Sequence, residues 1–76
     1  MLKEYLARNL KSMRRKNDWT QEVAAELCGL SPRFWGKIER GKASASVDTL
    51  EKITSGLNIG IDELFAGEEG DVGGEE

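Results

Sequence analysis

Residues Trp19–Gly41 read W-T-Q-E-V-A-A-E-L-C-G-L-S-P-R-F-W-G-K-I-E-R-G, a pattern typical of two short helices joined by a tight turn. Thr20 is placed to cap the first helix, because its side-chain oxygen can accept from free backbone N–H groups of the next turn. Gly29 stands where a helix ends on a left-handed residue, a conformation that glycine adopts without strain. Ser31 and Pro32 predict the start of the second helix, since the missing proline N–H does no harm at the first helical position.

Apolar residues recur at helical spacing on both helices, which predicts one buried face for each of them. The residues expected to hold the two helices together are Val23, Ala24, Leu27, Cys28, Leu30, Trp35 and Ile38. Two helices joined through a short turn that carries a glycine form a helix-turn-helix motif.

Three further helices are predicted outside this motif, one before it and two after it. The first covers residues 2–16 with one apolar stripe, and it ends at Asn17 and Asp18, residue types that tolerate a left-handed turn. The fourth is capped by Ser46 and covers about residues 47–55, and a short fifth helix follows near residues 61–65.

The fourth helix is expected to bury Val47, Leu50 and Ile53 and to end at Gly56 and Asn58 around a buried Leu57. The apolar residues of the fifth helix are Ile61, Leu64 and Phe65. No alternating β pattern occurs, so the sequence predicts an all-α fold, a compact five-helix bundle with the helix-turn-helix formed by helices 2 and 3.

The charges divide the chain into two parts. Residues 66–76 hold five of the fourteen acidic residues and no basic one, so residues 1–65 carry eleven basic against nine acidic side chains. We therefore predict a mildly basic folded domain over residues 1–65 and a disordered acidic Gly/Glu tail over residues 66–76. A basic body permits a nucleic-acid surface without proving one.

The composition excludes several functional classes. A single cysteine and no histidine rule out an internal disulfide and make a Cys/His zinc site implausible, so Cys28 is interpreted as a core residue. No serine or cysteine has a base at recognisable spacing, and the sequence predicts no catalytic residue, metal or cofactor. Without an apolar run of 18 residues or a signal-peptide pattern, we expect a cytoplasmic protein without membrane contact.

With these features in view, residues 6–65 resemble the phage repressor and Cro type of helix-turn-helix regulator, the XRE family. The matching pieces are Leu6 through Met13-Arg14, T-Q-E at 20–22, Ala25, Gly29-Leu30-Ser31, Ile38-Glu39-x-Gly41-Lys42, Ser46-Val47-Asp48-Thr49-Leu50 and Ile61-Asp62-Glu63-Leu64-Phe65. The resemblance implies a lambda-repressor-like DNA-binding fold.

The same resemblance implies that the third helix, about residues 32–40, enters the major groove of double-stranded DNA. The base-contacting residues implied by position are Pro32, Arg33, Phe34 and Lys37. The phosphate-contacting residues implied by position are Thr20, Gln21, Arg40 and Lys42. The family pattern also implies an ion pair between Arg14 and Glu39 that ties the first helix to the third.

Residue chemistry supports some of these roles and leaves others open. Arg33 and Lys37 are four apart on one helical face and both can donate to guanine O6 and N7, which favours DNA contact over the alternative of two solvated surface charges. Gln21 is otherwise an ordinary polar residue of a first helical turn. Phe34 is either half-buried packing or a wedge against a sugar or thymine methyl. Gly36 either lets the third helix approach DNA closely or only lowers the stability of that helix, since glycine has a low helix propensity.

Together these features predict a sequence-specific DNA-binding transcriptional regulator, a repressor, that acts as a homodimer on a palindromic operator. The expected dimer surface is formed by Ile59, Ile61, Leu64 and Phe65, which alternatively only close the core. A second class is a protein-interaction module with its own protein partner, such as an antitoxin or a member of a restriction–modification control system with the same fold.

Overall fold

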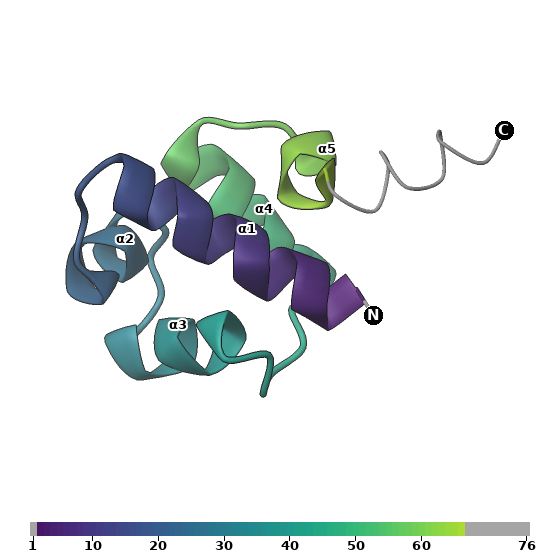
Figure 1. Ribbon diagram of the computed structural model, residues 1–76, viewed down its shortest axis with the longest axis horizontal. Helices are drawn as coiled ribbons and strands as arrows, with labels where there is room; N and C mark the ends of the chain where they lie inside the picture. The colour runs from purple at the N-terminus through teal and green to yellow at the C-terminus, as the bar shows by residue number, and fades with distance from the viewer. Residues whose placement is uncertain (1, 67–76) are drawn as a thin grey trace, which may run out of the picture.

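Five helices follow one another along residues 2–66, the part of the chain that the structure, a computed structural model, describes (Figure 1). In chain order they are α1 (Leu2–Lys16), α2 (Gln21–Leu27), α3 (Pro32–Glu39), α4 (Val47–Leu57) and α5 (Ile61–Leu64). No strand occurs among the described residues, so the predicted all-α, five-helix fold is confirmed. Apart from Ala66, the predicted acidic tail lies outside the described residues.

Hydroxyl side chains cap the N-terminal ends of α2, α3 and α4, as predicted from the sequence. The hydroxyl of Thr20 accepts from the N–H of Val23 at 3.1 Å, and that of Ser31 accepts from the N–H of Phe34 at 3.0 Å. Ser46 does the same for α4, accepting from Thr49 at 3.2 Å. Each hydroxyl satisfies a backbone donor that has no partner inside its helix.

Left-handed residues separate the helices. Asp18 (φ 63°) follows α1, Gly29 (φ 69°) follows α2, Gly41 (φ 71°) follows α3 and Asn58 (φ 58°) ends α4. The predicted stop at Gly56 is wrong, because α4 continues through Gly56 to Leu57. The residues at the turns therefore define where α1, α2, α3 and α4 end. Gly56, in contrast, lies inside α4, where a Cβ would meet the backbone of Leu27 and Cys28.

The helix-turn-helix packs against the rest of the domain through both of its members. α3 contacts α2 and α1, α2 also contacts α4, and α1 also contacts α5. Figure 1 shows α1 crossing the middle of the molecule, with α3 on one side of it and α4 and α5 on the other. The core between these helices contains the buried residues Leu6, Leu10, Ala24, Ala25, Cys28, Trp35, Ile38, Ile53 and Leu64.

Three apolar residues predicted to be buried lie at the surface instead. Val23 and Leu27 of α2 are 41% and 46% exposed, and Val47 of α4 is 74% exposed. The face of α2 that enters the core is the narrower one formed by Ala24, Ala25 and Cys28. α4 closely approaches the C-terminal end of α2, since a Cβ on Gly56 would lie 2.4 Å from the carbonyl oxygen of Leu27.

Candidate nucleic-acid interface

Helix α3 has two chemically different faces. Trp35 and Ile38 are completely buried and Glu39 nearly so, which anchors the helix in the core. On the opposite side Arg33 and Lys37 are exposed to solvent. Within residues 2–66 neither of these two cations takes part in an ion pair or a side-chain hydrogen bond. The outer face of α3 therefore presents two available donors one helical turn apart.

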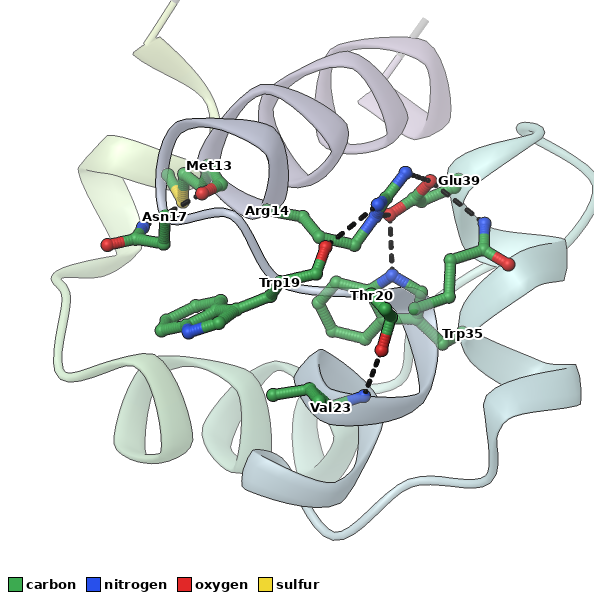
Figure 2. Close-up of polar contacts among 9 residues, drawn as sticks. Met13, Arg14, Asn17, Trp19, Thr20, Val23, Trp35 and Glu39 are labelled. Carbon is green, nitrogen blue, oxygen red and sulfur yellow. Dashed lines mark hydrogen bonds and ion pairs between the residues drawn. The ribbon is translucent and has the colours of Figure 1, made fainter.

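The inner face of α3 is tied to α1 and α2 by the carboxylate of Glu39 (Figure 2). Arg14 binds it with two nitrogens, Nε to Oε2 at 2.6 Å and Nη2 to Oε1 at 3.1 Å. Trp35 Nε1 donates to Oε2 at 2.6 Å, and Gln21 Nε2 donates to Oε1 at 3.0 Å. The structure thus brings the predicted partners Arg14 and Glu39 together, and it adds two donors for which the sequence predicts other roles.

The pKa of Glu39 reflects this arrangement. Burial on its own raises the pKa, but the hydrogen bonds from Arg14, Gln21 and Trp35 and the charge of Arg14 outweigh it and hold the pKa below its ordinary value. The Glu39 side chain is only 1% exposed and that of Arg14 16%, so the pair is buried and charged. The hydrogen bond to Glu39 likewise raises the pKa of Arg14.

Gln21 lies at the first residue of α2, beside the outer edge of α3. One N–H of its amide donates to Glu39, which leaves the second N–H for another acceptor. The neighbouring Thr20 is exposed, and its oxygen already accepts from Val23 as the helix cap. Its hydroxyl hydrogen is a donor, so both predicted phosphate contacts keep a donor group for an external oxygen.

Gly36 is buried beneath two neighbouring side chains. A Cβ at this position would lie 3.2 Å from Arg40 Nη1 and 3.6 Å from Gln21 Oε1. The guanidinium of Arg40 therefore folds back over α3 toward Gln21, instead of extending from the helix end. Gly36 provides the space for these two polar side chains, a role that differs from both interpretations of this glycine in the sequence.

The remaining predicted DNA-contacting residues differ in exposure. Pro32, the first residue of α3, and Lys42, which follows the helix, are both exposed. Phe34 is half-buried and packs against the hydrophobic core, in agreement with the packing interpretation of this residue. Trp35 was expected only to pack, and its indole N–H bond to Glu39 was missed. The four-residue spacing of Trp35 and Glu39 on one helix was the available signal.

The predicted dimer surface is divided by the structure. Leu64 is completely buried, so it closes the core and its assignment to a dimer surface is wrong. Ile61 is 50% exposed, while Ile59 and Phe65 are partly buried. Ile59 and Ile61 line a shallow apolar groove together with Val47, a residue that the sequence places in the core.

Other chemistry is not apparent in the described part of the chain. Residues 2–66 contain no group of three or more histidine, cysteine or acidic side chains arranged to hold a metal ion. The thiol of Cys28 is buried, and this burial raises its pKa to about 11, as expected for a core cysteine. None of the five described helices combines the length and apolarity needed to cross a bilayer.

Comparison with known proteins agrees with this picture. The family HTH_3, described as helix-turn-helix, matches residues 10–64. The chain is 41% identical over 58 residues to the control protein C.MunI of Mycoplasma sp, an alignment that covers 75% of this chain and 78% of that protein. It is 40% identical over 58 residues to the HTH-type transcriptional regulator SutR of Escherichia coli (strain K12), over 76% of this chain and 33% of SutR.

A solved structure of an HTH_3 family transcriptional regulator from Vibrio cholerae superposes with a TM-score of 0.83 and 37% identity, over 90% of this chain and 38% of that one. The chain thus spans about a third of the length of SutR and of the Vibrio regulator. The family match extends from the second half of α1 to the end of α5 and confirms the resemblance seen in the sequence. The chain belongs to the HTH_3 family of helix-turn-helix, DNA-binding transcriptional regulators.

Proposed function

We propose that this protein binds a specific DNA sequence by placing the outer face of α3 in the major groove. The observation that carries the proposal is the division of α3 into a buried face and an outer face with two available cations, Arg33 and Lys37. Both can donate to O6 and N7 of guanine, the commonest specific contact to a base edge. Pro32 and the exposed part of the half-buried Phe34, at the start of α3, contribute apolar contacts to bases.

Phosphate contacts would hold α3 in register on the duplex. Thr20 and Gln21 lie at the start of α2, and Arg40 and Lys42 follow α3. Contacts of this kind position a protein without reading sequence. Gln21 supports the assignment because its bond to Glu39 holds the amide beside α3 while leaving one N–H available.

The functional form that we propose is a homodimer on a palindromic operator. Ile61 and Val47 are large apolar residues at the surface, and they share one groove with Ile59, close to Phe65 in the chain. Exposed apolar side chains gathered in one place favour association. As the mode of action we propose repression by occupancy of the operator, in the cytoplasm, through binding alone and without catalysis.

A second role is favoured by one of the relatives. C.MunI is named a control protein, and the similarity covers 78% of its length. This supports a control function, linked to a restriction–modification system or a toxin–antitoxin pair, in which a protein partner accompanies DNA binding. Copurification of the tagged protein with a neighbouring gene product would identify such a partner.

The test of the leading proposal is selection of bound sequences from random duplexes at a stated salt concentration. The wild type should enrich one palindromic motif, and Arg33→Ala should relax the preference at one position of each half-site. Lys42→Ala should weaken binding to all sequences alike. Lys52→Ala, an exposed lysine of α4 outside the proposed interface, is the control and should leave both the motif and the affinity unchanged.

Failure to enrich any motif with the wild type would refute sequence-specific regulation. An unchanged motif and stringency with Arg33→Ala would instead remove Arg33 alone from the base-reading residues.

A further inference from the structure

A basic groove lies between α1 and the C-terminal end of α3, outside the residues assigned to DNA so far except for Arg40. It has a volume of about 880 Å³ and is lined by the cations Arg8, Lys11, Arg15, Lys16 and Arg40. Four of these five come from α1, a helix that the sequence assigns to the core through its apolar stripe. The groove is therefore a second concentration of positive charge on the domain.

The carboxylates in the groove do not cancel this charge. The acidic residues that line it are Glu4 and Glu39, against five cations, and Glu39 is already paired with Arg14. Arg8 is held in place by the ring of Tyr5, with its guanidinium carbon 4.8 Å from the ring centroid. A groove with this excess of cations attracts polyanions.

The cations of α1 form a row along one side of the helix. Arg8, Lys11 and Arg15 are three and four residues apart, which places them along one side of the helix. With a rise of about 1.5 Å per residue, the row is about 10 Å long. One strand of B-DNA presents a phosphate about every 3.4 Å along the helix axis while it winds around that axis, so a row of this length can meet more than one phosphate of a passing strand.

Arg40 makes the groove continuous with the outer face of α3. It lines the groove at the end of α3, and its Nη1 lies close above Gly36 in the middle of the same helix. α1 and α3 are packed directly against each other. The backbone of a duplex seated on α3 has a continuous basic path past Arg40 onto α1, and this continuity favours DNA over an unrelated acidic peptide as the occupant.

We propose that the groove between α1 and α3 binds the phosphate backbone of DNA that flanks the bases read by α3. The inference rests on the proposed DNA-binding function and extends its footprint beyond the contacts of residues 20–21 and 40–42. The added contacts are independent of sequence. They raise affinity and salt dependence, and they require a duplex longer than the recognised bases.

The test uses the full chain with Lys11→Gln and Arg15→Gln combined, since both side chains line the groove and glutamine preserves helix propensity. The matched control combines Lys3→Gln and Lys52→Gln, which removes the same charge from two exposed residues outside the groove. Thermal unfolding of both variants should match the wild type. Affinity for the selected operator is then measured against salt concentration, together with ethylation interference at each phosphate.

The groove variant should reduce the slope of log K against log[salt] by about 0.9 for each phosphate that the protein no longer neutralises, hence by up to about 1.8. It should also abolish interference at flanking phosphates while enriching the same motif as the wild type. The control should keep the wild-type slope and pattern. The slope on a non-specific duplex should fall in the same way.

An unchanged slope and interference pattern in the groove variant would overturn the inference while leaving the proposed function intact. Tighter DNA binding by the groove variant, with an unchanged interference pattern, would also overturn it, because the groove cations would then oppose DNA binding instead of contributing to it. Absence of any enriched motif in the wild type would refute sequence-specific recognition alone. The inference about the groove would then be tested by the salt dependence of binding to a non-specific duplex, compared between the groove variant and the wild type.

Discussion

Glu39 holds together the three helices that form the proposed DNA-binding face. Each of its carboxylate oxygens accepts two hydrogen bonds, and the donors come from α1, α2 and α3. A carboxylate offers about four lone-pair sites, so this buried charge is fully satisfied. Because Gln21 is among the donors, the same group that stabilises the core also orients a proposed phosphate contact.

Replacing Glu39 by alanine should be strongly destabilising, because it leaves the charge of Arg14 without its partner in a largely buried place. We expect a loss of about 3–5 kcal/mol in the free energy of unfolding, measured by urea denaturation. Glu26→Ala removes an exposed carboxylate from α2 and should change stability by no more than about 0.5 kcal/mol. Equal melting temperatures for the two variants would contradict the structural role of the Arg14–Glu39 pair.

Glu39 should also make stability depend on acid pH. Its pKa is lowered in the folded state from the ordinary value of 4.5, so below about pH 5 the unfolded chain binds more protons than the native one. The stabilisation is complete above the unfolded-state pKa and is lost as pH falls through 4.5 toward the folded-state pKa. Urea unfolding between pH 3 and pH 7 should therefore show a shallower decline for Glu39→Gln than for the wild type. Parallel curves would show that Glu39 does not titrate in this way.

At the scale of the helices, two glycines inside α3 and α4 have opposite surroundings. A Cβ on Gly56 would meet backbone atoms of α2 and its C-cap, the Leu27 oxygen at 2.4 Å and the Cys28 Cα at 2.7 Å. A Cβ on Gly36 would meet only the ends of the Arg40 and Gln21 side chains. Glycine is therefore required in α4 by the distance between two helices, whereas in α3 it is accompanied by side chains that can move.

Gly56→Ala should destabilise the domain although alanine favours a helix by about 1 kcal/mol. The added methyl can be accommodated only by separating α4 from the end of α2, and overpacking of this kind costs about 1–3 kcal/mol. The measurement is the shift of the urea midpoint at an unchanged slope. A variant as stable as the wild type would show that α4 is not held at this distance.

Gly36→Ala is the matched substitution in α3 and should have the opposite sign. The guanidinium of Arg40 needs to move by only a few tenths of an ångström, so the gain in helix propensity should prevail and stabilise the domain by up to about 1 kcal/mol. Urea denaturation measures the change. A destabilisation as large as that of Gly56→Ala would mean that Arg40 and Gln21 are rigidly fixed above Gly36.

At the scale of the whole molecule, the proposed dimer surface is the apolar groove lined by Val47, Ile59 and Ile61. None of these residues belongs to α3, which carries the proposed base contacts. A charge at Ile61, which lines this groove, should separate the protomers without unfolding them, since Ile61 is already 50% exposed. Ile61→Glu should thus sediment as a monomer at concentrations where the wild type is a dimer, and its affinity for a palindromic operator should approach that for a half-site.

Val23→Glu provides the comparison for this prediction, because Val23 is exposed to a similar degree, 41%, on α2. It should sediment like the wild type. Dimers of Ile61→Glu, or monomers of the wild type at high concentration, would remove this groove from the proposed assembly.

The sequence by itself determined where the helices begin, where they end apart from the last turn of α4, and that the domain is a helix-turn-helix. Thr20, Ser31 and Ser46 act on N–H groups three residues away, and Asp18, Gly29 and Asn58 adopt left-handed conformations that depend mainly on their own side chains. Local interactions of this kind can be inferred from neighbouring residues alone. The exposed positions of Arg33 and Lys37 followed in the same way from the period of one helix.

Only the tertiary structure decided which apolar residues are buried and which polar groups meet. Helical periodicity indicated an apolar side of α2, but the packing of α2 against the other helices placed Ala24 and Ala25 in the core and left Val23 and Leu27 in solvent. The bonds of Gln21 and Trp35 to Glu39 and the basic groove beside α1 depend likewise on helix packing. These features join residues that are distant in the chain or depend on how helices pack, so their contacts are specified by the packing of the whole domain.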